Sequence, residues 1–257
     1  MASLQEHIRS HLFSKSLSVS PTWITTFVHS LSQGQQRAPP SALAQTALFR
    51  LLASDFTTSL STSEPSTLLP RDISDPHVQE RRIPGPVPVQ VLDIEDIGVS
   101  LWSQVEAIEQ LERGETVRGR EIIRNVDVDD ADNTRNNTTG RPQEDRESNN
   151  NKSRGPHRLV LQDAAGTKVM ALELKTVEGI AIGKLPIGAK MLLKNTVVGR
   201  GMALLTPDTV TLLGGKIEAM DTAWKKNRKE NLLRQIDALN QERRGNIRDT
   251  EVVEIDD

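Results

Sequence analysis

The chain has 257 residues, of which 26% are charged and 36% hydrophobic, and its formal net charge at pH 7 is −3. It contains no cysteine, which excludes disulfide bonds and thiolate chemistry, and no apolar run long enough to predict a membrane span. Aromatic residues make up only 3%, and tyrosine is absent. Because single-strand-binding proteins combine basic grooves with stacking aromatics, this composition argues against strong DNA binding by the chain alone.

The first 56 residues predict a small helical bundle. Ser20 followed by Pro21 is typical of a helix start, and apolar residues then recur at helical spacing from Ile24 to Leu31. Ser41 can cap another helix with leucines on one face, and a shorter helix is expected over residues 2–13. A bundle of this size has little core of its own, so we expect it to dock on its neighbour.

Residues 57–81 begin with a polar stretch and are expected to form a linker. A barrel is expected over residues 82–215. Its first strand is predicted where valines alternate with other residues from Val87 to Val91. Within that strand Pro88 suits only an edge or a strand end, because proline has no N–H for the sheet.

Asp93, Glu95 and Asp96 follow this strand and raise the question of an acid/base cluster or a divalent metal site. No histidine or nucleophile stands near them in the sequence. We therefore expect a solvated turn at the exit of the strand.

A segment over residues 98–157 interrupts the predicted barrel. Residues 100–111 predict a helix with one apolar face, and residues 120–128 have β character. Residues 129–155 are almost free of apolar side chains, so we expect them to be disordered. Loops of such length are usually functional or disordered, and we expect this one to be both.

The inserted segment carries the candidate partner-binding residues. Trp102 lies beside the apolar face of the predicted helix and is expected to pack in the core or to cap the barrel. Contact with a partner is the alternative, because aromatic residues on inserted segments often anchor interfaces. Farther along the insertion, isoleucines stand among arginines. An insertion without a function would not need these side chains, so we expect this segment to bind a partner. The candidate set is Trp102, Arg118, Arg120, Ile122, Ile123 and Arg124.

Strand patterns resume at residues 158–161 and again where Met170, Leu172 and Leu174 share one face. Leucine-rich and β-branched runs then continue to residue 215. Gly199-Arg200-Gly201 joins two of these runs and tolerates the positive φ of a tight hairpin.

A charged helix is expected over residues 216–244, followed by an acidic tail over residues 245–257. The helix places Ile217, Met220 and Trp224 where they can pack on the barrel. Two interpretations fit its basic residues. They contact DNA or an acidic partner, or they form an ordinary solvated face of the helix. Acidic residues stand among them, so the solvated face is favoured. The candidate nucleic-acid contacts are Lys225, Lys226, Arg228 and Lys229.

Two further patterns have simpler explanations than a functional site. His7 and His11 are four residues apart, as metal ligands on a helix can be, but no acidic or cysteine partner stands at a ligand spacing. The glycines around Arg200 and before Lys216 match neither a P-loop nor a dinucleotide fingerprint. We therefore expect no metal, no cofactor and no catalytic residues, and hence no enzyme activity.

The stretch from Leu185 to Gly215 carries a family resemblance. It reads LPIGAKMLLKN, then VGRGMALLTPDTVTLLGG after two residues, and it resembles the end of the N-terminal OB-fold of the RecQ-mediated genome instability proteins. A weaker likeness extends upstream through Leu69-Pro70, through Val87 to Ile94, and to the helical segment around Trp23. It covers roughly residues 20–240.

The resemblance implies a mainly β fold with α: a small N-terminal helical bundle, an OB-fold barrel with a long insertion after strand one, and a C-terminal helix. It also implies a non-catalytic scaffold subunit in the nucleus. The partners would be a type IA topoisomerase III and a RecQ-type helicase. Such a complex promotes decatenation and dissolves double Holliday junctions during DNA recombination, repair and replication.

In this family the barrel docks on the topoisomerase, and the inserted loop reaches its DNA gate. In this chain the loop's role would fall on residues 113–155. The resemblance implies weak or indirect DNA contact, no membrane and no small-molecule substrate, and it leaves open whether a further small OB-fold subunit is recruited. The main alternative is an OB-fold protein that binds single-stranded DNA directly.

Overall fold

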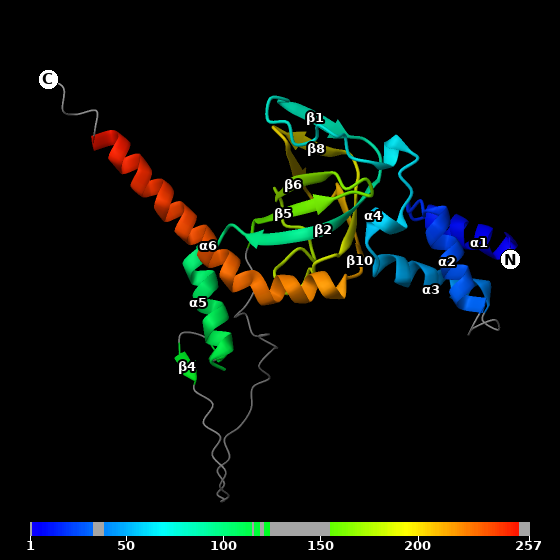
Figure 1. Ribbon diagram of the computed structural model, residues 1–257, viewed down its shortest axis with the longest axis horizontal. Helices are drawn as coiled ribbons and strands as arrows, with labels where there is room; N and C mark the ends of the chain where they lie inside the picture. The colour runs from blue at the N-terminus through cyan, green and yellow to red at the C-terminus, as the bar shows by residue number, and fades with distance from the viewer. Residues whose placement is uncertain (1, 33–38, 115, 119–120, 124–154, 252–257) are drawn as a thin grey trace, which may run out of the picture. The chain divides into compact units, whose positions relative to one another are not determined.

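The computed structural model describes residues 2–32, 39–114, 116–118, 121–123 and 155–251 (Figure 1). The chain divides into two compact units, one of Met1–Gly98 with Arg154–Asn227 and one of Val99–Ser153 with Arg228–Asp257. Within the described ranges, no helix combines the length and the apolar character needed to cross a membrane.

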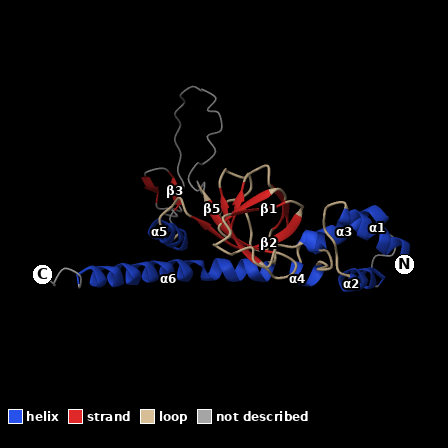
Figure 2. Cartoon of the chain, turned by 90° about the horizontal axis from the view of Figure 1, so that it is seen from above, coloured by secondary structure: helices blue, strands red, loops and turns tan. Residues whose placement is uncertain are grey.

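Three helices, α1 (Ala2–Phe13), α2 (Pro21–Ser32) and α3 (Pro40–Leu52), form the N-terminal bundle of the first unit (Figures 1 and 2). The predicted start of α2 is confirmed, since the Ser20 hydroxyl accepts a hydrogen bond from the Trp23 N–H at 3.2 Å and Pro21 is the first helical residue. A short helix, α4 (Phe56–Ser59), leads from the bundle to the sheet. The core of the bundle includes Ile8, Leu12, Leu17, Ile24, Phe27, Val28, Leu43, Ala47, Leu51 and Phe56.

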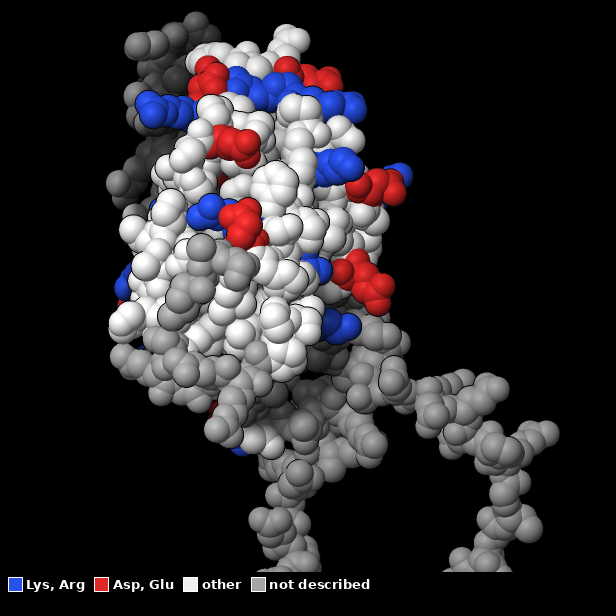
Figure 3. Space-filling view, turned by 90° about the vertical axis from the view of Figure 1, so that its right-hand side faces the viewer, with Lys and Arg blue, Asp and Glu red and all other residues white. Residues whose placement is uncertain are grey.

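The bundle contributes little charge to the protein surface. In α1, α2, α3 and the described residues that connect them, the Lys, Arg, Asp and Glu residues are Glu6, Arg9, Lys15 and Arg50. Figure 3 shows the side of the protein that carries the bundle: charged side chains gather toward its upper edge, and much of the remainder is uncharged.

Eight strands form one curled, OB-like sheet in the order β1-β8-β9-β6-β5-β2-β7-β10, which confirms the predicted fold class. Neighbouring strands are antiparallel except for the parallel pair β6 and β9. The strands are β1 (Glu80–Ile83), β2 (Val87–Asp96), β5 (His157–Gln162), β6 (Lys168–Glu173), β7 (Lys190–Leu193), β8 (Thr196–Gly199), β9 (Met202–Leu205) and β10 (Val210–Gly214).

The strand that the sequence predicts as the first is β2, the second strand in the chain. β1 precedes it and pairs with β8. Its sequence, Glu-Arg-Arg-Ile, has no apolar alternation, so its strand conformation depends on that pairing rather than on local pattern. Pro88 lies where β2 pairs with β7 alone, since the pairing with β5 begins at Gln90. The missing N–H of Pro88 is therefore tolerated, as expected of a strand end.

Residues 57–81, expected to form a linker, hold the end of α4, the 3-10 helix η1 (Pro65–Thr67) and the start of β1. Three of their apolar side chains, Leu60, Leu69 and Ile73, are almost completely buried. The segment therefore packs against both the bundle and the barrel.

The predicted hairpin at Gly199-Arg200-Gly201 is confirmed. It joins β8 to β9, and both Arg200 (φ 47°) and Gly201 (φ 79°) adopt the left-handed conformation. Gly201 is required for a second reason: a Cβ at this position would lie 2.5 Å from the carbonyl oxygen of Ser74.

The second unit contains α5 (Leu101–Glu112), the small antiparallel pair β3 (Thr116–Arg118) and β4 (Glu121–Ile123), and the C-terminal part of α6 (Glu218–Glu251). The Ser100 hydroxyl caps α5 by accepting from the Ser103 N–H. Val105 on α5 packs with Leu232 and Ile236 on α6. The helix predicted over residues 100–111 is thus confirmed, and α6 continues beyond residue 244.

A buried polar network joins α4 to the barrel in the first unit. The side-chain oxygen of Gln90, on β2, accepts hydrogen bonds from the Phe56 N–H and from the Lys190 amine, both at 3.0 Å. The amide nitrogen of Gln90 donates to Asp55 at 2.9 Å and to Gln162 at 3.1 Å. Every hydrogen-bonding position of this fully buried amide is therefore used.

Lys190, on β7, is the charged member of this network and is completely buried. Its amine lies 4.7 Å from the centre of the Phe56 ring, a cation–π contact. Burial lowers the pKa of Lys190 to about 8, against the opposing effect of the Asp55 carboxylate. Burial acts to raise the pKa of Asp55, but hydrogen bonds from Thr57 and Gln90 and the charge of Lys190 outweigh it, so the net shift is downward.

We predict that Lys190 makes the stability of the protein rise with pH above about 8. Between pH 8 and 10.5 the unfolded chain keeps the proton that folded Lys190 has lost, so the free energy of unfolding increases across that window. Relative to Lys190→Met, the wild type should gain up to about 3 kcal/mol. The measurement is denaturant unfolding of both proteins at several pH values. The control is Lys194→Met, at an exposed lysine just after β7. Parallel curves for wild type and Lys190→Met would contradict the prediction.

Candidate protein-docking face and insertion

Four neighbouring strands, β5, β6, β9 and β8, carry aliphatic side chains on the outer side of the sheet. Ala171 on β6 and Ala203 on β9 point into the core and are fully buried. Because side chains alternate between the two faces of a strand, their neighbours in the sequence point outward. We call this set the outer aliphatic face; it consists of Val160, Met170, Leu172, Val197, Met202 and Leu204, all half-buried or exposed.

The strand register brings these six residues into contact distance. Met170 lies opposite both Val160 and Met202. Leu172 lies opposite Leu204, which in turn lies opposite Val197. Directly opposed residues on one face have Cβ atoms about 5 Å apart, so the two rows form a continuous apolar patch.

Charged residues border the outer aliphatic face at both ends of the row formed by Leu172, Leu204 and Val197. At one end Arg158 lies opposite Leu172 and forms an ion pair with Glu95. At the other end Arg82 lies opposite Val197. An apolar centre with a polar rim is the usual anatomy of a protein–protein interface.

The sequence correctly predicts that Met170, Leu172 and Leu174 share a face, and the structure shows that this face points outward. Met170 is 39% and Leu174 56% exposed, whereas Val169 and Ala171 line the core. The inner positions of a small barrel accept small side chains where it is narrow, which explains the opposed pair Ala171 and Ala203. The longer aliphatic side chains are left on the surface.

The two ends of the insertion are fixed side by side on the barrel. The Ile97 N–H donates to the Pro156 carbonyl at 3.0 Å, directly beyond the paired ends of β2 and β5. Backbone segments pass so closely here that a Cβ on Gly98 would lie 2.6 Å from the Gly155 carbonyl oxygen. The inserted segment therefore leaves and rejoins the barrel at one place.

A buried pair of side chains holds the returning end of the insertion. His157 Nδ1 lies 2.6 Å from a carboxylate oxygen of Glu173, which also accepts from the His157 backbone N–H at 3.1 Å. The other carboxylate oxygen accepts from the Val177 N–H at 2.6 Å. This pair was not predicted from the sequence. The feature that could have revealed it is Glu173, a charged residue at a position where the alternating pattern of β6 places side chains in the core.

The expectation of a solvated turn at Asp93, Glu95 and Asp96 is wrong, because all three lie within β2. Asp93 accepts from the indole N–H of Trp224 at 2.6 Å, and Asp96 is buried and accepts from the Gly98 N–H at 2.8 Å. These carboxylates have structural partners on separate elements. Among the described residues, no group of three His, Asp or Glu side chains could hold a metal ion.

The expectation that Trp102 packs in the core is also wrong, since its side chain is 57% exposed. Leu101, Val105 and Ile108 make the apolar face of α5 that packs with α6, and Trp102 lies to one side of it. The alternative, contact with a partner, stays a prediction. Of the other candidates, Arg118 lies in β3 and Ile122 and Ile123 in β4. Arg120, Arg124 and the segment predicted to be disordered, up to residue 154, lie outside the described residues.

The basic residues of α6 have local partners. Lys225 forms an ion pair with Asp221 at 2.7 Å, and Lys229 forms ion pairs with Glu112 at 2.8 Å and Glu109 at 3.2 Å. Hydrogen bonds to Glu112 and Glu109 raise the pKa of Lys229. Arg228 donates to the side chain of Gln104 at 3.2 Å, and Lys226 is exposed. This arrangement favours the solvated face, and contact with DNA stays a prediction.

Two models of protein families match the chain. The model described as "RMI1, N-terminal OB-fold domain" matches residues 69–228, and the one described as "RMI1, N-terminal helical domain" matches residues 12–59. The chain is also 29% identical, over 204 residues, to the RecQ-mediated genome instability protein 1 of Schizosaccharomyces pombe. That alignment covers 79% of this chain and 84% of the relative.

The partners of the basic residues predict weak binding of single-stranded DNA. Phosphate contact would have to break ion pairs of Lys225 and Lys229, and the outer aliphatic face offers no aromatic ring for stacking. We expect filter binding to oligothymidine to be weak at physiological salt and to fall steeply as salt increases. The combined variant Lys225→Ala, Lys226→Ala and Arg228→Ala should weaken it further. Nanomolar binding that survives these changes would show that another surface binds DNA.

Proposed function

The chain belongs to the RMI1 family of RecQ-mediated genome instability proteins, and on that premise we propose that it serves genome stability together with a RecQ-type helicase. More specifically, we propose a non-catalytic scaffold subunit that acts in the nucleus with a type IA topoisomerase III. The complex would decatenate DNA and dissolve double Holliday junctions. Weak or indirect DNA contact by this subunit is part of the same proposal.

The outer aliphatic face is the observation that carries the proposal. Six aliphatic side chains on paired strands make a rigid apolar surface, and charged residues border it. Such a surface suits the burial of a protein partner rather than of nucleic acid, which needs cations and aromatic rings. We propose that the topoisomerase docks there.

The insertion supports a second role for the same subunit. Its two ends are joined by the hydrogen bond from Ile97 to Pro156, and its returning end is held to β6 by His157 and Glu173. The described strands of the insertion, β3 and β4, pair with each other and not with the barrel sheet, and a segment held at its base in this way can reach a moving part of the partner. It would shift the opening of a DNA gate only if it binds the open and closed states with unequal affinity. Trp102, Arg118, Arg120, Ile122, Ile123 and Arg124 are the residues we propose for that contact.

We also propose that the chain catalyses no reaction, and this proposal rests on its residues. The chain has no cysteine and no nucleotide-binding loop, and its buried histidine, His157, is held by a carboxylate at the base of the insertion. A direct single-strand-binding function is the second candidate. The aliphatic composition of the outer face counts against it.

We predict that charge on the outer aliphatic face abolishes binding to the topoisomerase. The variant Met170→Glu with Leu204→Glu places two carboxylates at the centre of the patch, where docking would bury them without a partner. Binding should weaken at least about a hundredfold, with little loss of stability because both side chains are partly exposed. Co-elution with a purified type IA topoisomerase III measures the effect. Thr211→Glu, at an exposed position of β10, is the matched control and should bind normally.

Unchanged co-elution of the double variant would show that the topoisomerase docks elsewhere. Circular dichroism and thermal unfolding of both variants test whether the barrel is intact. Loss of binding by an unfolded double variant would not count for the proposal. In that case the milder pair Met170→Gln with Leu204→Gln is measured, and it should still weaken binding.

We predict that docking and gate control separate when the insertion is shortened. Replacing residues 115–154 by a flexible Gly/Ser linker leaves α5, its cap and the base of the insertion in place. The shortened protein should still co-elute with the topoisomerase but should no longer stimulate decatenation. Full stimulation would contradict the role of the insertion, and complete loss of binding would show that the two functions are inseparable.

A further inference from the structure

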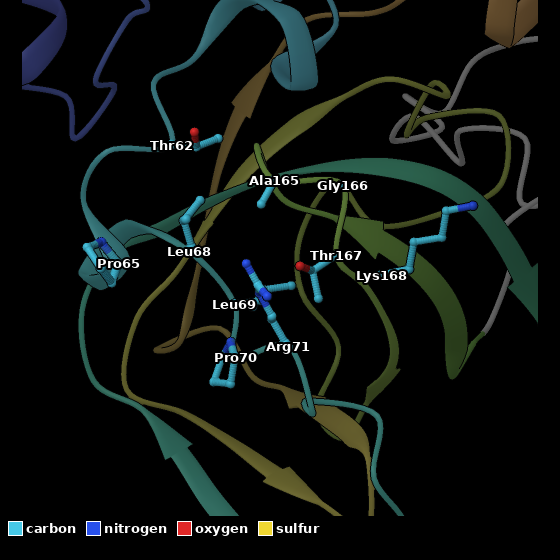
Figure 4. A pocket seen from close by; sticks show the side chains of 10 residues that line it. All are labelled: Thr62, Pro65, Leu68, Leu69, Pro70, Arg71, Ala165, Gly166, Thr167 and Lys168. Carbon is cyan, nitrogen blue, oxygen red and sulfur yellow. The ribbon is translucent and has the colours of Figure 1, made fainter.

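A groove lies beside the end of the barrel where β5 turns into β6. One wall is formed by residues between Thr62 and Arg71, and the other by the turn from Ala165 to Lys168 (Figure 4). The groove has a volume of about 1010 Å³, enough for several amino-acid residues. Most of its lining residues are exposed, so it is open to solvent along its length. None of them belongs to the outer aliphatic face.

The two walls are held together by one buried carboxylate. Asp163, which is fully buried, accepts from the Leu69 N–H on one wall and from the Thr167 N–H on the other, both at 2.8 Å. The Ser74 hydroxyl also donates to the Lys168 carbonyl at 3.0 Å. The shape of the groove is therefore set before anything binds, which lowers the entropy cost of binding.

The polar side chains that line the groove are those of Thr62, Arg71, Thr167 and Lys168. In Figure 4 the side chains of Arg71 and Thr167 point into the same hollow, whereas the amine of Lys168 points away from it. Among the described residues, Arg71 has no ion pair. The nearby carboxylate of Asp72 is taken by Arg81, through two hydrogen bonds of 2.7 and 2.8 Å. Of the described residues that line the groove, none is acidic.

The rest of the lining is largely aliphatic. Pro65, Leu68, Pro70 and Ala165 flank the hollow into which Arg71 points. A guanidinium beside aliphatic surface matches a carboxylate next to an aliphatic side chain, because the guanidinium fork binds carboxylates through two parallel hydrogen bonds. Nucleic acid fits less well, since the lining has no aromatic ring and Lys168 points elsewhere.

We propose that this groove binds an extended peptide segment of a partner protein, one that carries an aspartate or glutamate next to an aliphatic residue. The carboxylate accepts hydrogen bonds from the Arg71 guanidinium and the Thr167 hydroxyl. The neighbouring aliphatic side chain packs on Leu68 and the two prolines. The proposal does not depend on the docking of the topoisomerase, because it concerns separate residues of the barrel.

The test is a selection of random peptides on the immobilised full chain. The peptides are about seven residues long, which span roughly 20 Å when extended. Wild type, Arg71→Met and the control Arg9→Met, at an exposed arginine of α1, are used in parallel. Peptides with an acidic residue beside an aliphatic one should be enriched on the wild type and on Arg9→Met. Enrichment should be lost on Arg71→Met.

A selected peptide is then titrated into the isotope-labelled chain. The amide signals of Ala165, Gly166 and Thr167 should shift, and the affinity should fall at least about tenfold for Arg71→Met or when glutamine replaces the acidic residue of the peptide. Arg71→Lys should recover only part of the loss, because an ammonium lacks the planar fork. Equal enrichment on wild type and Arg71→Met, shifts confined to other residues, or displacement of the peptide by oligothymidine would overturn the proposal.

Discussion

The buried amide of Gln90 is the interaction on which this fold depends. A bundle of three short helices has too small a core to be stable alone, so it must be held by its neighbour. Gln90 links the barrel to the end of the helical region through two hydrogen bonds, to Phe56 and Asp55, and two more, to Gln162 and Lys190 on neighbouring strands, fix its amide in place. A buried polar network is stabilising only when every member is satisfied, because a missing partner leaves an uncompensated polar group in a low dielectric. The network thus adds directional polar contacts to the apolar contacts that Ala164 and Leu213 of the barrel make with the bundle core.

The sequence predicts the features that local chemistry decides, and it misses those that depend on contacts between distant residues. The helix cap at Ser20 and the hairpin at Arg200-Gly201 follow from short-range steric and hydrogen-bonding rules, although the cap expected at Ser41 is wrong, because α3 begins at Pro40 with Pro39 as its N-cap. β1 has no such pattern and exists through its pairing with β8. The Gln90 network joins residues up to 100 positions apart, so no local window contains it.

The candidate site was predictable in the same partial way. Alternation correctly groups Met170 with Leu172, but a period of two says only which residues share a face, not which face is inside. That choice depends on Ala171 and Ala203, which lie opposite each other in the core although they are far apart in the sequence. The expectation for Trp102 failed for a related reason. The sequence places Trp102 beside the apolar face of a helix, but it does not show how much of that helix surface α6 covers.

The exposed aliphatic face and the fixed base of the insertion together suit a subunit that works through a partner. Large apolar patches are uncommon on proteins that stay monomeric, because their exposure is unfavourable in water and invites aggregation. Here the patch lies on central strands bordered by Arg82, Arg158 and Glu95, so no strand edge is offered for nonspecific pairing there. The charged rim limits which partner surfaces can dock on the patch. The rigid sheet beneath the patch holds the base of the insertion in a fixed position. A base held in this way would keep the segment close to a docked partner, and its contacts there would bias the partner only through unequal affinity for the partner's two states.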